Sequence, residues 1–156
     1  NEETESSPTN FCIGVAGYPE KHLDAVSFDA DINYLKHKVA NGADYIVTQM
    51  VFDNQKYFSF VERCRQEGIN IPIIPGLKPL STKKQMTILP KIFHLEFPED
   101  LVQEAGKCNS DQEIRELGIE WGVQQCQELI QFGAPVLHFY TMGKSDNVGK
   151  IAARIF

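Results

Sequence analysis

Four short apolar segments stand out along the chain, at residues 11–17, 45–51, 71–77 and 136–141. Each is bounded by polar residues, glycine or proline, and the second is rich in β-branched side chains. Unbroken apolar runs of this length are typical of strands that are buried on both faces of a parallel sheet. We therefore expect four parallel strands, each covered on both faces.

Between these segments, apolar side chains recur every three or four residues, which predicts amphipathic helices. Ser110 and Glu113 form a capping-box pattern that opens the longest helix, and Gly133 ends it. Gly42 follows the first helix as a C-terminal cap, and a further helical stretch is expected within residues 82–105. The apolar stripes are Ile32, Leu35 and Val39; Tyr57, Val61 and Cys64; and Ile119, Val123, Cys126 and Ile130.

Strands and helices alternate along the sequence, which indicates an α/β fold with a parallel sheet and right-handed connections. Two architectures share this pattern: a small doubly wound sheet, and part of a (β/α)8 barrel. A complete barrel needs eight strand–helix units and about 250 residues. The pattern predicts four units in this chain of 156 residues, and by itself it leaves both architectures open.

The composition is that of a folded domain, with 42% hydrophobic and 23% charged residues. The net charge is −6 and no basic stripe is present, which argues against a nucleic-acid partner. No apolar run approaches the roughly 20 residues that cross a bilayer, so no membrane partner is expected. The four scattered cysteines lack zinc-ligand spacing, so we expect no metal and a reducing, cytoplasmic setting. Polar residues 1–10 are expected to form a linker before a domain at 11–156.

Ligands of such folds bind beyond the carboxyl ends of the parallel strands, where this sequence places several polar residues. Gln49 ends the second apolar segment, and its amide is costly to bury without a partner, so it either caps a neighbouring loop or serves a ligand. Asp31 and Lys38 are seven positions apart on one helix face, which is either solvated or turned toward an anionic ligand. His22 alone is read more simply as a loop residue that hydrogen-bonds a carbonyl.

A different barrel enzyme, such as an aldolase, is a further hypothesis. It would need a Schiff-base lysine buried at a strand end, and Lys78 is the only lysine so placed, with prolines close by. The sequence contains no phosphate-binding glycine loop and no nucleophile elbow.

Several motifs occur in the order and with the spacing of one known enzyme family. They are G-V-A-G-Y-P-E-K-H at 14–22, L-K-H-K-V-A-N-G-A-D at 35–44, I-V-T-Q-M-V-F-D at 46–53, I-I-P-G-L-K-P at 73–79 and L-H-F-Y-T at 137–141. Together they resemble the motifs of 5,10-methylenetetrahydrofolate reductase. The similarity covers nearly all of residues 11–156.

The resemblance implies a flavoprotein that binds FAD in a (β/α)8 barrel, also called a TIM barrel. Such an oxidoreductase takes hydride from NADH or NADPH and reduces 5,10-methylenetetrahydrofolate to 5-methyltetrahydrofolate, in one-carbon metabolism and methionine biosynthesis. The nicotinamide reduces the flavin and leaves before the folate takes its place. The resemblance further implies that residues 11–156 are the C-terminal half of the catalytic barrel, so that the four expected strands are its last four.

The resemblance also assigns binding residues. Gln49 corresponds to a glutamine that serves both folate and nicotinamide. Tyr34 and His37 stand where some family members have the Asn and Arg that help to hold FAD. Lys144 replaces an Arg that clamps the folate glutamate tail, and it keeps the charge without the bidentate fork. The other FAD-contacting positions are Tyr18, His22, Ala25, Asp31 and Lys38, and the second folate-binding glutamine is Gln85.

Two parts of the family's machinery are not in this sequence. The general-acid glutamate belongs to the first barrel strand, and an L-R-G-D segment belongs to the fourth; neither has a counterpart here. We therefore expect these 156 residues alone to be inactive, and expect them to need the N-terminal half of the barrel or a second copy as a partner. The alternative is a non-catalytic half-barrel that binds a ligand or pairs with itself through its open sheet edges.

Overall fold

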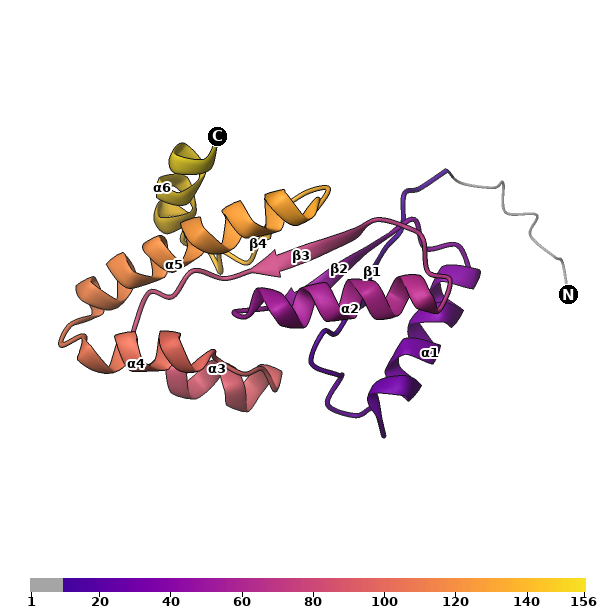
Figure 1. The fold of residues 1–156 in the computed structure, drawn as a ribbon, viewed down its shortest axis with the longest axis horizontal. Coiled ribbons are helices and arrows are strands. Elements are labelled where there is room, and N and C mark those ends of the chain that lie inside the picture. Colours follow the sequence, from indigo (N-terminus) through magenta and orange to yellow (C-terminus); the bar gives the residue numbers. More distant parts are fainter. Residues whose placement is uncertain (1–9) are drawn as a thin grey trace, which may run out of the picture.

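The computed structural model describes residues 10–156, so the linker predicted at residues 1–10 lies almost wholly outside the described residues. The described part folds as strands and helices that alternate along most of its length, as the sequence predicts (Figure 1). The elements are β1 (Gly14–Gly17), α1 (Phe28–Ala40), β2 (Tyr45–Met50), α2 (Asn54–Gln66), β3 (Ile73–Leu77), α3 (Gln85–Phe93), α4 (Glu99–Lys107), α5 (Asp111–Phe132), β4 (His138–Phe139) and α6 (Asp146–Ile155).

The four strands form one parallel sheet in the order β1-β2-β3-β4. Across the first three strands Ala16 lies beside Val47, and Val47 beside Ile74. The last strand joins through Gly76 and His138. Each strand pairs with its neighbour in the sequence, so the order of the described strands contains no reversal. A doubly wound sheet reverses its order at a switch point, and this sheet therefore lacks the defining feature of that architecture.

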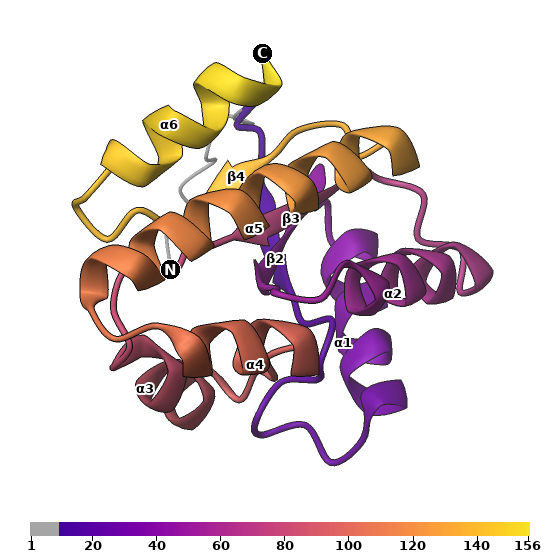
Figure 2. The same ribbon diagram turned by 60° about the vertical axis from the view of Figure 1, so that its left-hand side comes forward.

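One hydrophobic core joins the sheet to four helices. Ile46 and Ile73 of the sheet pack in one cluster with Phe60 of α2, Leu129 of α5 and Ile151 of α6, and residues of α1 complete it. A second cluster packs α3, α4 and the start of α5 together. Figure 2 shows α5 lying between α6 and α4, so this helix belongs to both clusters.

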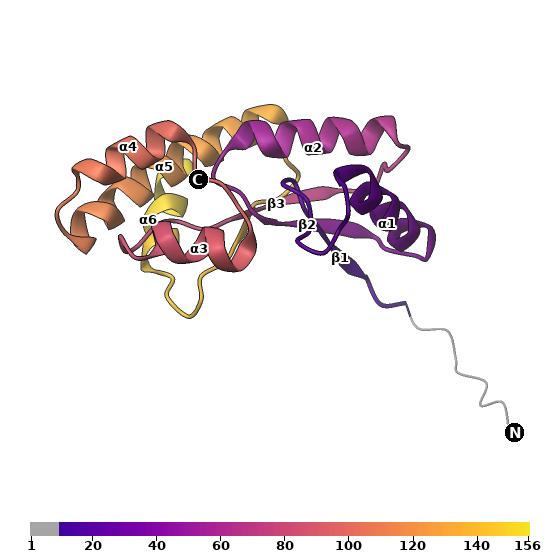
Figure 3. The ribbon, with the colours of Figure 1, turned by 90° about the horizontal axis from the view of Figure 1, so that it is seen from below.

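The prediction that every strand is covered on both faces is wrong for β1. Gly14 and Ala16 are exposed, and Phe11 and Ile13, just before the strand, are 77% and 49% exposed. In the view of Figure 3, α2 and α5 lie on one side of the sheet. Among the described residues β1 pairs only with β2, so it is an edge strand, and apolar side chains on its uncovered face meet solvent. Val136, just before the opposite edge strand, is 56% exposed for the same reason.

The long helix α5 begins and ends at the residues that the sequence predicts. The Ser110 hydroxyl accepts a hydrogen bond from the Glu113 N–H at 3.2 Å. The carboxylate of Glu113 turns back to the Asn109 N–H at 2.6 Å, one residue before the partner that a standard capping box would use. Gly133 ends the helix in a left-handed conformation with φ of 94°, which glycine adopts without steric cost.

The buried face of α5 differs from the predicted stripe. Ile130 is 43% exposed, whereas Leu129 is fully buried. The helix turns its small residues toward its neighbours, because Gly118 faces the backbone of Leu80 and Gly122 faces the side chain of Ile151. The prediction from large apolar side chains therefore missed this contact face, because glycines form part of it.

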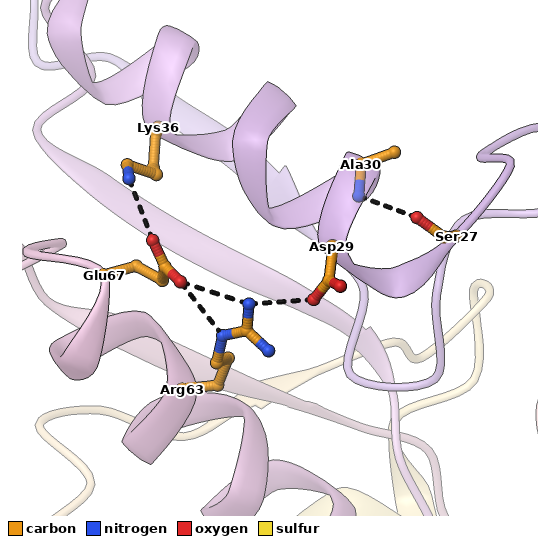
Figure 4. Close-up of polar contacts among 6 residues, drawn as sticks. All are labelled: Ser27, Asp29, Ala30, Lys36, Arg63 and Glu67. Carbon is orange, nitrogen blue, oxygen red and sulfur yellow. Dashed lines mark hydrogen bonds and ion pairs between the residues drawn. The ribbon is translucent and has the colours of Figure 1, made fainter.

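An ion-pair network joins α1 to α2 on the outside of the molecule (Figure 4). The Arg63 guanidinium lies 2.8 Å from the Asp29 carboxylate and 3.1 Å from that of Glu67. Glu67 also receives the Lys36 ammonium at 2.9 Å. At the start of α1 the Ser27 hydroxyl accepts from the Ala30 N–H at 3.1 Å and caps the helix. Exposed ion pairs are screened by salt, so this network adds little stability but fixes how the two helices face each other.

The network makes stability depend on pH. Hydrogen bonds from Lys36 and Arg63 lower the pKa of the Glu67 carboxyl from its ordinary 4.5. The stabilisation is therefore fully present above pH 4.5 and is lost as the pH falls through the lowered pKa of the folded chain. In urea unfolding at neutral pH and at about pH 3, the wild-type midpoint is expected to fall more on acidification than that of Glu67→Gln. Glu62→Gln, an exposed change on the same helix, should behave as wild type; equal acid sensitivity of all three proteins would contradict the prediction.

Candidate ligand pocket at the strand ends

The loop after β1 is held in place by the first turns of α1. The His22 N–H donates to the Asp31 carboxylate at 2.8 Å. The Tyr18 and His22 rings contact edge to face, with centroids 4.5 Å apart. Burial and the nearby Asp31 charge raise the pKa of Tyr18 above its ordinary 10, so the phenol stays protonated at neutral pH. The predicted residues at 18, 22 and 31 thus form one connected group.

Lys38 brings a positive charge to this group. Its Nζ donates to the Ala16 carbonyl at 3.1 Å and lies 5.9 Å from the centroid of the Tyr18 ring. An ammonium group has three N–H donors, so Lys38 can contact an anionic ligand while it keeps this bond to β1. The seven-residue spacing of Asp31 and Lys38 does place both on one helix face, and that face is turned toward the loop.

A second lysine, Lys21, braces the same loop, although it was not among the residues predicted for the site. Its Nζ donates to the carbonyls of Ala25 and His22 at 2.6 and 3.1 Å. Its backbone has φ of 75°, in the left-handed region that favours glycine. The Lys21 side chain thus hydrogen-bonds backbone carbonyls of a loop that has no regular secondary structure.

These residues surround a pocket of about 290 Å³ at the carboxyl end of β1. Six of the seven residues assigned to FAD from the sequence line it, together with one residue that was not predicted. Their side chains supply an aromatic ring, an imidazole, carboxylates and an ammonium group around one space. The pocket is lined by Tyr18, His22, Asp24, Ala25, Asp31, Tyr34 and Lys38.

His37 and Asp24 are the two differences from the predicted set. His37 is exposed and does not line the pocket, because neighbouring residues of a helix are rotated by about 100° from each other and Lys38 takes the pocket side. Asp24 lines the pocket, and its N–H donates to His22 Nδ1 at 3.1 Å. The Nδ1 atom therefore acts as an acceptor here, and none of the hydrogen bonds described above has the His22 ring donating to a backbone carbonyl.

Gln49 lies next to this pocket. Both Gln49 and Tyr18 line a narrow cavity between the ends of β1 and β2, so Tyr18 borders the two spaces. The Gln49 Oε1 atom accepts from the Met50 N–H at 2.9 Å, which fixes the orientation of the amide. Its Nε2 then remains to donate to a ligand.

Gln85 and Lys144 stand at the ends of the other two strands, outside the pocket. The Gln85 Oε1 atom accepts from the N–H of Ser81 at 2.8 Å and so closes the loop before α3. Its Nε2 also remains available as a donor. Lys144 is exposed in the turn after β4, where its N–H donates to the Thr141 carbonyl at 3.1 Å. The structure therefore brings Gln49 to the pocket and leaves Gln85 and Lys144 on separate loops.

Tyr140 covers the end of β3 and was not among the predicted site residues. Its hydroxyl donates to the Thr48 carbonyl at 2.9 Å, and a side chain at Gly76 would collide with its ring. The buried Lys78 donates from Nζ to the Tyr140 carbonyl at 3.2 Å. Burial lowers the pKa of Lys78 below its ordinary 10.5, but this lysine lines none of the cavities described above. The aldolase hypothesis thus has a buried amine without a substrate pocket beside it.

Two negative findings apply to residues 10–156. Within that range no three or more His, Cys, Asp or Glu side chains are grouped so that they could hold a metal ion. The same range contains no helix with the length and apolar character needed to cross a membrane.

The chain is thus an α/β domain with a pocket lined by charged and aromatic side chains beyond the end of a parallel strand, where ligands bind in such folds. The chain belongs to the methylenetetrahydrofolate reductase family, whose model matches residues 4–155. It is 40% identical to methylenetetrahydrofolate reductase 1 of Schizosaccharomyces pombe over 146 residues, which are 93% of this chain and 24% of that protein. It is 36% identical to methylenetetrahydrofolate reductase (NADH) 1 of Arabidopsis thaliana, covering 93% of this chain and 26% of that protein.

The share of each relative that the chain covers differs between relatives. The Pectobacterium carotovorum 5,10-methylenetetrahydrofolate reductase is 33% identical, over 88% of this chain and 46% of that protein. The chain therefore spans about a quarter to a half of the relatives it matches. A solved structure, described as an uncharacterized protein from Clostridium thermocellum that binds two copies of 5-methyl-5,6,7,8-tetrahydrofolic acid, shares the fold with a TM-score of 0.58. At 17% identity it covers 92% of this chain and 52% of that one.

Proposed function

We propose that residues 11–156 form the C-terminal half of the catalytic (β/α)8 barrel of a methylenetetrahydrofolate reductase. The observation that carries this proposal is the pocket of about 290 Å³, where six residues assigned to FAD lie around one space with Lys38 among them. Family membership supports the reaction, and the pocket supports a place for its cofactor. In the intact protein, this half supplies much of the flavin site and part of the folate site.

The strand order of the sheet supports the proposal that these residues are part of a barrel. The parallel strands follow one another in sequence order, as they do around a barrel. One side of the sheet carries the packed helices, while apolar residues next to both edge strands are exposed. Four further strands that pair with β1 and β4 would close the sheet and cover these side chains.

The residues around the pocket supply groups that suit parts of FAD. Lys38 supplies a fixed cation for a phosphate group or for the flavin ring, and Tyr18 supplies an aromatic face. Asp31 accepts hydrogen bonds, which suits a sugar or ribityl hydroxyl, and His22 can donate from Nε2. When bound, the flavin supplies a group that accepts and returns hydride. The part of this chain is to bind and orient it, since the general-acid glutamate and the L-R-G-D segment are not in this sequence.

The folate and the nicotinamide would meet the same end of the sheet. Gln49 and Gln85 each have their amide oxygen tied to backbone N–H groups of their own loops, so both present Nε2 donors to acceptors of a pterin or a carboxamide. Lys144 is an exposed cation suited to the carboxylates of a folate tail. Relatives are named as users of NADH in Arabidopsis thaliana and of NADPH in Caenorhabditis elegans, and either fits this proposal.

A visible absorption spectrum of the purified chain tests the flavin proposal. After incubation with FAD and removal of the excess, wild-type protein should retain flavin absorbance. Lys38→Met should bind FAD about ten- to a hundredfold more weakly, because it removes a charged hydrogen bond that is worth about 1.5–3 kcal/mol. Lys36→Met is the matched control, since Lys36 pairs with Glu67 outside the pocket. Equal retention by Lys38→Met and wild type would contradict the role of Lys38.

The exposed apolar edges favour a second candidate function, a half-barrel that pairs with itself. Phe11, Ile13 and Val136 are each about half exposed or more, and edge strands offer unpaired backbone groups to a second chain. Sedimentation of the chain at several concentrations tests this candidate. A stable dimer that binds no FAD would favour it over the catalytic proposal.

A further inference from the structure

Glu20, in the loop after β1, is a buried carboxylate that joins three distant segments. Its side chain is only 11% exposed. Its Oε2 atom accepts from the Glu96 N–H at 2.9 Å, in the connection between α3 and α4. The Lys56 ammonium of α2 lies 3.9 Å from the same oxygen and 2.9 Å from the Glu96 carboxylate. We call these three residues the Glu20 clamp.

Burial makes the ionised form of Glu20 less favourable. It raises the pKa of the carboxyl above the ordinary 4.5, although the Glu96 N–H and Lys56 act in the opposite direction; the Glu96 and Asp53 carboxylates add to the rise. A carboxyl with a raised pKa favours folding in its protonated form, and that contribution is lost as the pH rises through the folded pKa. The ionised side chain is therefore less favourable for folding than the protonated one.

The clamp connects the flavin side of the site to the folate side. Glu20 lies between Tyr18 and His22 in the sequence. Helix α3 starts at Gln85 and ends at Phe93, and its C-cap residue His94 adopts a left-handed conformation with φ of 52° two residues before Glu96. Residues at the end of this helix line the narrow cavity that also holds Gln49 and the loop after β1. The backbone bond to Glu20 thus anchors the end of α3 beside both.

We propose that Glu20 is a positioning residue that, with Lys56, holds the C-terminal end of helix α3, the helix that begins at Gln85, against the loop that carries Tyr18 and His22. It acts through these residues and does not itself touch the ligand. The inference rests on the proposed function, because it takes Gln49 and Gln85 as folate-binding residues. The flavin loop has separate supports in Asp31, Lys38 and Lys21, so loss of the clamp affects folate binding more than flavin binding.

Three measurements on the full chain test the clamp with Glu20→Ala, Glu20→Gln and the exposed control Glu62→Gln. Hydrogen exchange at the Glu96 amide should be at least about tenfold faster in Glu20→Ala, where the N–H loses its partner, and unchanged in Glu62→Gln. In Glu20→Gln, which keeps an acceptor oxygen and loses the charge, exchange should be intermediate. The urea midpoint of Glu20→Gln should equal or exceed that of wild type, since the ionised carboxyl is less favourable for folding than its neutral form.

The third measurement is the affinity of FAD-loaded protein for 5-methyltetrahydrofolate. Glu20→Ala should bind it about tenfold more weakly, with unchanged FAD affinity, and Glu20→Gln, which keeps an acceptor oxygen for the Glu96 N–H, should bind it with an affinity between those of Glu20→Ala and wild type. Wild-type exchange at Glu96 in Glu20→Ala overturns the clamp. Faster exchange with unchanged folate affinity overturns the positioning role. A wild-type chain that binds neither compound overturns the binding roles proposed for these residues in the isolated chain and the positioning role with them, and the wild-type result alone identifies that case.

Discussion

Replacing Phe60 with Ala should lower the free energy of unfolding by about 3–5 kcal/mol, the usual cost of deleting a buried aromatic side chain. Phe60 is 2% exposed in the core that joins α2 to the sheet. Its ring lies under Gly17, where an added Cβ would come within 2.9 Å of it. Because Gly17 precedes Tyr18, the cavity would open directly beneath the loop that forms the pocket. Urea unfolding followed by circular dichroism measures the loss.

Phe156→Ala is the matched control for this prediction. The same atoms are deleted from a side chain that is 91% exposed, so the unfolding free energy should change by less than about 0.5 kcal/mol. A loss at Phe60 as small as the loss at Phe156 would mean that α2 does not pack on the sheet as described.

Gly118→Ala should destabilise the chain by about 1–3 kcal/mol or more, even though alanine is the better helix former. A Cβ at position 118 would overlap the Leu80 carbonyl oxygen and lie 2.8 Å from the Leu80 nitrogen. Leu80 is 1% exposed, and its carbonyl also accepts from the Asn147 side chain at 3.3 Å. The backbone there cannot move aside cheaply, so α5 would have to shift away from the loop after β3.

Gly106→Ala is the matched control, and it should change the free energy of unfolding in the opposite direction. Gly106 lies in helix α4, and a Cβ at this position meets nothing within 4 Å. Alanine there should therefore stabilise the chain by up to about 1 kcal/mol. If both substitutions shift the urea midpoint in the same direction, the close approach of α5 to Leu80 is wrong.

The strands and helices were predictable where local patterns decide them. The apolar segment at 45–51 became β2 (Tyr45–Met50), and the Ser110 cap and Gly133 bound α5 as the sequence indicates. The burial of β1 was not predictable in the same way, because an apolar run does not report how many layers cover it. Of the apolar segment 136–141, only His138 and Phe139 form a strand, because β4 pairs with β3 only through Gly76 and Leu77.

In the pocket, too, residues on one helix could be predicted from the sequence, whereas contacts between distant segments could not. The spacing of Asp31, Tyr34 and Lys38 on one helix could be read from the sequence, and these residues do line one space. Glu20 could not be found in this way, because its partner Glu96 is 76 residues away and donates a backbone N–H. Any residue at position 96 other than proline carries that donor, so no side-chain pattern marks the contact.

The strand order also has a consequence for how the chain acquires its structure. Each strand pairs with the one synthesised just before it, and each crossover helix is complete before the next strand appears. The sheet can thus be extended from β1 to β3 by contacts between segments that are close in sequence, which keeps the entropy lost on closing those loops small, whereas β4 joins only after α3, α4 and α5 have been made. Leu129 of α5 and Ile151 of α6 are synthesised last among the core residues. The packing of the early strands is therefore complete only after α5 and α6 have formed.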